Sequence, residues 1–333
     1  MIPLAGIEER SFSDLDEVRE HLSKRNRFDL ELPLKNVSID DLGAFRAGKA
    51  EGRLTEPAMR GLARQLRIPE GFVRDMPADL FTYTVGRLVR DRDDMVRIHT
   101  EDDLVTGIMP GNYLPVRHEL VAQWLKGRRS GVHATLSPTY MRVTLPNQES
   151  APVLPGDMYQ SGSEIVNHEN GLGALEVRQY VLRLVCLNGL VTPQTTASYS
   201  RQPHGDDPVS RALEEMARVV NEPQNPTELE KPVRWAADRA VGGDLAKVVR
   251  FLAARLEGET TRSALNEINE DSTWYALLNS VTAFARSRPA ETRRRYEVIG
   301  GLLLGWFMRE GRGHAPWRRR PCEHCTRADE IAN

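Results

Sequence analysis

The chain has 333 residues, of which 40% are hydrophobic and 28% charged. A chain of this length and composition buries a substantial core and has room for two domains, so we expect a soluble globular protein. The formal net charge of −2 excludes a global attraction to nucleic acid or to a membrane. A charged partner must therefore be recognised by a local patch.

Cysteine content and hydropathy limit the cellular compartment and the relation to a membrane that we expect for the protein. Three cysteines, an odd number, do not suggest a disulfide framework in a chain of this size. The N-terminus lacks the basic start and apolar run of a signal peptide. The longest apolar stretch, residues 298–308, is shorter than the roughly 20 residues that cross a bilayer. We expect a cytoplasmic protein without a membrane partner.

Residues 1–90 have a mainly helical pattern. Ser13 or Asp14 is suited to cap a helix over 15–25, and Thr55 to cap one that ends before Ile68-Pro69. Further helices are predicted at 69–76 and 78–91. The helix that ends before Pro69 and the short helix at 69–76, joined at that proline, also suggest a helix-turn-helix, but Arg74 is the only basic reader of the 69–76 helix. The commoner αα-hairpin is the alternative.

From Asp94 the hydrophobic period changes toward two, which predicts short strands separated by Gly, Pro and Asn. These strands are expected within residues 95–100, 103–110, 131–138, 140–146, 153–162 and 164–169. A helical pattern at 114–127 interrupts them. Residues 174–196 follow as a strand, an Asn188-Gly189 turn and a returning strand. Alternatively, residues 180–188 form a helix capped by Gly189. Both alternatives bury Cys186, which lacks a neighbouring base and so is expected to be structural.

After residue 205 the pattern is helical. Stripes at helical spacing, with prolines or glycines at most joints, predict helices within 208–221, 226–241, 244–258, 261–287 and 289–311. The predicted fold class is therefore α+β, with a helical N-terminal part, an antiparallel β-rich core and a helical C-terminal region. The predicted organisation is an α+β core over 1–205, a helical region over 208–312, and a basic Cys/His tail over 313–333.

Four segments carry a resemblance to a known family. They are LTEPAMRGLARQLRIPEGFVRDMP, TGIMPGNYLPVRHELV, YQSGSEIVNHENGLGALEVRQYVLRLVCLNGLV and STWYALLNSVTAFARSRPAETRRRYEVIGGLL. In this order they resemble the phage/plasmid-like family known as domain of unknown function 932, over about Leu54 to Leu304. The family tends to show N-S-E-V-G where this chain has SGSEIVNHENGLGAL, a departure that suggests a short insertion. The resemblance implies a phage or plasmid setting, in which many small proteins handle DNA, but no established reaction. By analogy of context, the architecture is similar to single-strand annealing proteins, which form oligomers around single-stranded DNA.

The clearest local charge lies near the C-terminus. Residues 286–320 hold ten arginines against three acids, a net charge of +7 that leaves −9 for the rest. Guanidinium groups bind phosphates and aromatic rings stack on bases, so this segment suits single-stranded nucleic acid. The arginines are interleaved with Tyr296, Trp306, Phe307 and Trp317. The alternative is that Trp306 and Phe307 belong to a buried face and the arginines form a solvated or intersubunit face. The candidate nucleic-acid-binding residues are Arg286, Arg288, Arg293, Arg294, Arg295, Trp317, Arg318, Arg319 and Arg320, with Lys126, Arg128 and Arg129 as a second cluster.

The tail offers a candidate metal site. Cys322 and Cys325 form a C-x-x-C half-site near His314, and zinc prefers thiolate and imidazole ligands. A structural zinc clip is one interpretation. Incidental cysteines in a flexible tail are the other, and no cofactor is certain.

The sequence contains no P-loop, dinucleotide fingerprint, G-x-S-x-G or H-E-x-x-H motif. One histidine and acid set, His99, Glu101, Asp102, Asp103, His168 and Glu169, would have to gather in space to hold a metal. The leading hypothesis is therefore a non-enzymatic protein of phage or plasmid type that forms a homo-oligomer and binds single-stranded DNA for annealing in recombination or replication. The alternative is a protein-interaction or assembly module that does not bind nucleic acid. Interference with a host system is one role for such a module. An enzyme acting on nucleic acid through the histidine and acid set is a third hypothesis.

Overall fold

The chain forms two compact units, each assembled from three separate stretches. Unit 1 comprises residues 1–144, 165–176 and 198–216, and unit 2 comprises 145–164, 177–197 and 217–333. Each unit has a hydrophobic core of its own. The computed structural model describes residues 3–126, 132–183, 188–199, 208–221, 229–256, 261–262, 265–285, 288, 290–311, 315 and 317.

A six-stranded sheet of order β2-β6-β7-β5-β4-β3 is the framework of unit 1. Its strands are β2 (Arg27–Pro33), β3 (Val37–Ile39), β4 (Ala44–Ala47), β5 (Ala50–Leu54), β6 (Met95–Glu101) and β7 (Leu104–Pro110). Neighbouring strands are antiparallel except β5 and β7, which are parallel with Leu54 opposite Val105. In β2, Phe28, Leu30 and Leu32 alternate with charged residues. The strand therefore gives one face to the core and the other to polar side chains.

Two of the helices of unit 1 begin at side-chain caps that the sequence offers. The helices of this unit are α1 (Leu15–Ser23), α2 (Glu56–Leu66), α3 (Glu70–Asp75), α4 (Ala78–Val89), α5 (His118–Leu125) and, for the most part, α6 (Pro208–Asn221), with a 3-10 turn η1 (Leu34–Asn36). Asp14 accepts a hydrogen bond from the backbone N–H of Glu17 at 2.8 Å, and Thr55 caps α2. Helix α2 packs on β7. A Cβ at Gly61 would lie 2.3 Å from the carbonyl oxygen of Ile108, so this packing requires glycine.

Helix α2 ends in a left-handed residue that is not glycine. Arg67 has φ 59° and ψ 37°, and its backbone N–H is bonded to the carbonyls of Ala63 and Arg64. The backbone N–H of Ile68 donates to Ala63 at 2.9 Å. These bonds close the helix as a glycine would, although an L side chain is strained in this conformation.

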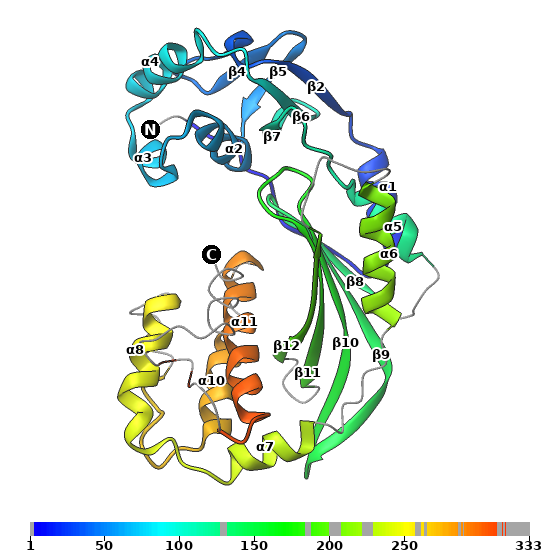
Figure 1. The fold of residues 1–333 in the computed structure, drawn as a ribbon, viewed down its shortest axis with the longest axis vertical. Helices are drawn as coiled ribbons and strands as arrows, with labels where there is room; N and C mark the ends of the chain where they lie inside the picture. Colours follow the sequence, from blue (N-terminus) through cyan, green and yellow to red (C-terminus); the bar gives the residue numbers. More distant parts are fainter. Residues whose placement is uncertain are drawn as a thin grey trace. The chain divides into compact units, whose positions relative to one another are not determined.

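The second sheet has the order β1-β8-β9-β10-β11-β12. Its strands are β1 (Arg10–Phe12), β8 (His133–Leu136), β9 (Met141–Leu154), β10 (Asp157–Asn167), β11 (Leu175–Arg183) and β12 (Asn188–Tyr199). Figure 1 shows β9 to β12 as long neighbouring strands in green. Pro155 and Gly156, the latter with φ 77°, link β9 to β10, as expected of a turn with proline first and glycine second. Strands β9 to β12 contribute residues to both units.

The helices of unit 2 enclose an aromatic core. They are α7 (Glu230–Ala237), the 3-10 turn η3 (Gly242–Asp244), α8 (Leu245–Arg255), α10 (Trp274–Ala285) and α11 (Ala290–Phe307). Helices α10 and α11 pack on each other and both pack on α7 (Figure 1). Trp274, Trp306 and Phe307 form ring contacts with centroid separations of 4.8–6.3 Å. None of the helices in the described part of the chain is long and apolar enough to span a membrane.

The α+β fold class is confirmed, with N-terminal helices, an antiparallel sheet core and C-terminal helices. Strands β1 to β5 lie in a region whose pattern predicted helices, because their charged residues alternate with apolar ones over only three to seven residues. Residues 175–183 and 188–199 are strands, so the helical alternative is wrong where it overlaps them. The turn predicted at Asn188-Gly189 is also wrong, since β12 begins at Asn188. Cys186 lies outside the described residues. The two units do not follow the division expected near residues 205–208.

Candidate functional site

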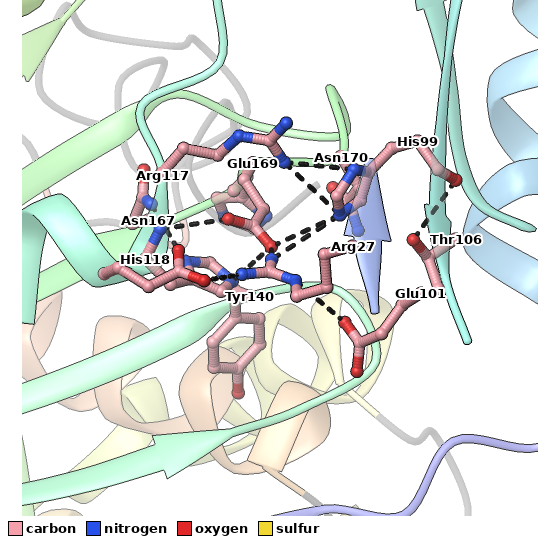
Figure 2. A network of polar contacts seen from close by, with 12 residues as sticks. Arg27, His99, Glu101, Thr106, Arg117, His118, Tyr140, Asn167, Glu169 and Asn170 are labelled. Carbon is pink, nitrogen blue, oxygen red and sulfur yellow. Dashed lines mark hydrogen bonds and ion pairs between the residues drawn. The ribbon is translucent and has the colours of Figure 1, made fainter. Parts of the chain in front are cut away.

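A buried polar cluster in unit 1 gathers charged side chains from four places in the chain. Arg27 and Asp29 come from β2, His99 and Glu101 from β6, and Glu169 from the segment after β10. Arg117 and His118 stand at the start of α5. Figure 2 shows these side chains converging around Arg27 and Glu169.

Arg27 is the central cation of this cluster. Its guanidinium contacts the carboxylates of Glu169 and Glu119, and its Nε lies 3.3 Å from Glu101. The side chains of Arg27 and Glu169 are only 8% and 7% exposed. Buried charges persist when they are paired. Arg27 has three carboxylate partners, although its Nε makes no hydrogen bond within the described part of the chain. Arg27 therefore joins β2, β6, α5 and the segment after β10.

His99 is held between Asp29 and Arg117. Its Nδ1 lies 2.8 Å from Asp29 Oδ1, so Nδ1 carries the proton that Asp29 accepts. Its Nε2 lies 3.5 Å from a guanidinium nitrogen of Arg27 and is suited to accept from it. Arg117 contacts the second oxygen of Asp29. The Asp29 and His99 pair thus resembles the oriented histidine of acid–base catalysts.

His118 is held in the opposite tautomer. The amide nitrogen of Asn167 donates to the Val116 carbonyl at 2.7 Å and to His118 Nδ1 at 2.9 Å. The proton of His118 is therefore on Nε2, which lies 3.8 Å from Glu169 Oε1. The backbone N–H of His118 donates to Glu169 Oε2 at 2.9 Å. Glu169 is thus positioned by both the backbone and the ring of one residue.

Burial keeps both histidines neutral. Burial lowers the pKa of His99, although the hydrogen bond to Asp29 acts in the opposite direction. Burial lowers the pKa of His118 well below its usual value, and the nearby charge of Arg27 adds to this. At Asp29, burial raises the pKa, but the hydrogen bond of His99 and the charge of Arg117 outweigh it and hold the pKa below its ordinary value. The cluster therefore has charged carboxylates and guanidinium groups around two neutral rings.

The cluster borders a small cavity of about 60 Å³, lined by His99, Glu101, Thr106, His118 and Glu169 among others. A space of this size admits a few water molecules. The lone pair of His99 Nε2 already faces Arg27, and Glu169 already faces two rings and a guanidinium. The arrangement can relay protons, but its polar groups bind one another first. Its clearest role is to hold unit 1 together.

The structure brings together part of the histidine and acid set named from the sequence. His99, Glu101 and Glu169 lie in the cluster, whereas Asp103 pairs with Arg53 at 3.2 Å and His168 Nδ1 is bonded to the Thr139 carbonyl at 2.9 Å. Asp102 lies 3.6 Å from Arg25. Among the described residues, no three His, Cys, Asp or Glu side chains are arranged to hold a metal ion. The metal-site interpretation of this set is wrong for the described part of the chain, because Arg27 is the cation at its centre.

Other members of the cluster had no clear signal in the sequence. Arg27 and Asp29 lie in a stretch whose pattern was interpreted as helical. Had the alternation in RFDLELP been recognised as a strand, both would have been placed on one face. Arg117, His118 and Asn167 are joined to the cluster only by tertiary contacts.

The aromatic rings near the C-terminus are packed inside unit 2. Tyr296, Trp306 and Phe307 are 1%, 6% and 0% exposed. Trp317 stacks on Trp274 with centroids 5.0 Å apart and an interplanar angle of 15°. The expectation that these rings lie open to bases is wrong for the three buried rings. One face of Trp317, which follows α11, is covered by Trp274 as well. The three buried rings each contact a ring of α10.

The arginines of the same segment are differently placed. Arg295 and Arg309 are exposed. Arg293 is half-buried and donates to the Arg288 carbonyl at 3.1 Å, and Arg288 lies over the ring of Phe284. Within the described residues, Arg293, Arg295 and Arg309 form no ion pair with a carboxylate. Arg294 lies in α11, but its side chain is outside the described part, as are Arg286, Arg318, Arg319 and Arg320.

The remaining predicted residues are only partly described. Lys126 follows α5 in unit 1 and pairs with Asp16 at 3.0 Å. Arg128 and Arg129 lie outside the described residues. So do His314, Cys322 and Cys325, and the zinc interpretation therefore stays a prediction.

Comparison with known proteins gave no match. No family model, no curated protein and no solved structure matches the chain. The family resemblance drawn from the sequence therefore stays a prediction.

Proposed function

We propose that this protein binds nucleic acid, with single-stranded DNA as its ligand, and that it does so without catalysing a reaction on it. The observation that carries the proposal is the group of arginines on α11 that lack carboxylate partners in the described part of the chain. Arg293 and Arg295 stand in the first two turns, and Arg309 follows the last. We further propose a homo-oligomer, by analogy of context with single-strand annealing proteins.

The position of Arg293 and Arg295 supports a phosphate ligand. The N-terminus of a helix carries a partial positive charge, so cations there raise the free energy of the helix when no anion is present. A phosphate at this end would interact with the helix dipole and with guanidinium groups together. Arg295 is exposed and its guanidinium is available for this contact. The same argument does not apply to Arg309, which lies at the other end.

Burial of the rings changes the expected mode of binding. Tyr296, Trp306 and Phe307 cannot stack on bases while they form the core of unit 2. Binding should then depend mainly on phosphate contacts and only weakly on base identity. If about three phosphates of a single strand are neutralised, affinity should fall roughly twentyfold between 50 and 200 mM salt. The phage or plasmid setting implied by the resemblance favours a single strand over a duplex.

Fluorescence polarisation with labelled single-stranded and duplex oligonucleotides at these two salt concentrations tests the proposal. The variant Arg293→Glu/Arg295→Glu should lose measurable binding. Arg87→Glu/Arg90→Glu is the matched control, because both arginines are exposed on or just after α4 and lie in unit 1. Equal affinity of the α11 variant and the parent protein refutes the proposal. Equal loss in both variants would indicate a dependence on net charge alone.

A second candidate function is protein interaction or assembly without nucleic acid. Exposed apolar side chains on α3 and α4 favour it, since Phe72, Leu80 and Tyr83 are 59%, 45% and 71% exposed. Large exposed apolar side chains in one region are typical of interaction surfaces. The mass of the assembly by light scattering, with and without oligonucleotide, distinguishes the two functions. Phe72→Ser/Tyr83→Ser should lower that mass if this surface mediates assembly.

A further inference from the structure

A second group of arginines in unit 1 lines an open pocket of about 430 Å³. Arg64 and Arg67 come from the C-terminal end of α2, and Arg92 comes from the loop between α4 and β6. Asp94 is the one acidic residue in the lining, so the pocket carries a net charge of +2. From this convergence we propose that the pocket binds the phosphate group of a small molecule of nucleotide size.

The loop around the pocket is held firmly. Arg92 contacts Asp94 through Nε and donates through Nη2 to the Gln65 carbonyl at 3.3 Å. The backbone N–H of Leu34 donates to the Asp94 carbonyl at 2.9 Å. Arg64 donates to Glu70 at 2.9 Å through Nε. Two of the guanidinium groups are thereby fixed in position while parts of each stay open to a ligand.

Arg67 differs from the other two. Its side chain is exposed, and within the described part of the chain it has no carboxylate partner. Its backbone is left-handed at a position where glycine is ordinarily found. A strained residue whose side chain has no carboxylate partner in the described part of the chain is a signal of function. Attraction to the negative end of the α2 dipole explains why basic residues lie at the C-terminal end of this helix. It does not explain the left-handed backbone of Arg67, or why Arg92 from the loop between α4 and β6 lines the same pocket.

The chemistry of the lining favours a phosphate monoester. Guanidinium groups bind the several oxygens of a phosphate in pairs of hydrogen bonds. The volume lies in the range of small-molecule sites, so a free inorganic anion would leave most of it empty. Gln65 and Asn112 offer amides for a sugar or base, and Leu34 and Met95 offer apolar contacts. This site is independent of the arginines on α11, which belong to unit 2.

The test is a calorimetric titration of the full-length protein with inorganic phosphate, a set of nucleoside monophosphates, and the matching nucleosides. At least one monophosphate should bind saturably, its nucleoside should not, and phosphate should bind more weakly. Arg67→Gly should weaken binding at least tenfold without lowering the melting temperature, because glycine suits the left-handed backbone. Arg67→Lys should weaken it less, and the control Arg87→Ala on α4 should not weaken it.

Two results of this titration would overturn the proposal. One is the absence of saturable binding for every phosphate-bearing ligand at 10-fold molar excess and millimolar protein, with the protein folded. The other is an Arg67→Gly variant that binds as tightly as the parent protein. Oligonucleotides with and without a 5′-phosphate distinguish the source of the phosphate. Tighter binding of the 5′-phosphorylated strand than of the same strand without the phosphate, lost in Arg67→Gly, together with no binding of a mononucleotide would identify a strand end, rather than a free nucleotide, as the ligand and would overturn the proposal of a small-molecule site.

Discussion

The substitution Glu169→Gln tests whether the buried polar cluster holds unit 1 together. It removes one carboxylate charge and keeps the shape and an acceptor oxygen for the His118 backbone N–H. Two unit charges about 4 Å apart attract by about 4 kcal/mol at an effective dielectric constant of 20. Removing one partner of a buried pair costs about 3–5 kcal/mol. Because Arg27 keeps Glu101 and Glu119, the expected loss in the free energy of unfolding is near the lower limit, about 3 kcal/mol.

The matched control is Glu119→Gln. Glu119 contacts the same guanidinium, but its side chain is 37% exposed whereas that of Glu169 is 7% exposed. Water screens the more exposed pair, so its loss should cost less than about 1 kcal/mol. The two variants remove the same charge from the same guanidinium, but Glu169 is also bonded to the His118 backbone N–H and lies near two histidine rings. Their comparison therefore measures the combined effect of burial and of these additional contacts.

Urea unfolding measured separately for unit 1 provides the assay. Trp124 is the one tryptophan in the stretches of unit 1, and the other four lie in those of unit 2. Fluorine NMR of fluorotryptophan at Trp124 therefore follows unit 1 alone. With a slope of about 2 kcal/mol per molar urea, Glu169→Gln should lower the midpoint by about 1.5 M. Equal midpoints for the two variants, or a shift below about 0.5 M for Glu169→Gln, would refute the reasoning.

Three other predictions concern stability. His99 and His118 have lowered pKa values in the folded state, so the unfolded state binds more protons below about pH 6.5. The free energy of unfolding of unit 1 should therefore fall by up to about 1.4 kcal/mol per histidine for each pH unit of acidification. His118→Gln should roughly halve this dependence of the unfolding free energy on pH, measured at Trp124. Gly61→Ala should lower the free energy of unfolding of unit 1 by about 2 kcal/mol or more, because the new Cβ meets a backbone oxygen. Gly86→Ala in α4 places its Cβ in open space and should raise that free energy by about 1 kcal/mol. Equal urea midpoints for the two variants would contradict this prediction. Trp317→Ala should destabilise unit 2 by about 2 kcal/mol, because the ring no longer stacks on Trp274. It should leave the affinity for oligonucleotides unchanged. A loss of affinity in the folded variant would show that Trp317 contacts the nucleic acid.

The sequence predicted most of the elements that have long periods or clear caps. Thr55, Pro69 and Pro77 mark the ends of the N-terminal helices, and β6 and β7 follow from alternation in MVRIHT and DLVTGIMP. Strand β2 escaped prediction because its charged residues are paired by β6 and α5, elements more than sixty residues away. Tyrosine, tryptophan and phenylalanine occur both on surfaces that stack on bases and in hydrophobic cores, so the residue types in α11 do not show which of the two they face. Only the packing of α10 on α11 decides between these alternatives.

The sequence names His99, Glu101 and Glu169 as a set that could gather, but spacing gives no sign of Arg27 at the centre of the cluster. Glu169 belongs to a stretch predicted as a strand, lies just after the end of β10, and is buried. Its burial depends on Arg27, which lies more than a hundred residues earlier in the chain. The left-handed Arg67 was equally hidden, since a helix end marked by Pro69 gives no information on which residue takes a positive φ.

The interleaving of the two units has a consequence for synthesis on the ribosome. The chain passes between the units at residues 144, 164, 176, 197 and 216. Unit 1 therefore cannot be completed until residue 216 has emerged from the ribosome. By then residues 145–164 and 177–197 of unit 2 have emerged, but the helices of that unit have not yet been made. Long-range pairing of this kind slows folding and leaves strand edges exposed to aggregation while it proceeds. Fragments cut near residue 205 would retain incomplete parts of both units, so neither half should be recovered as a folded product.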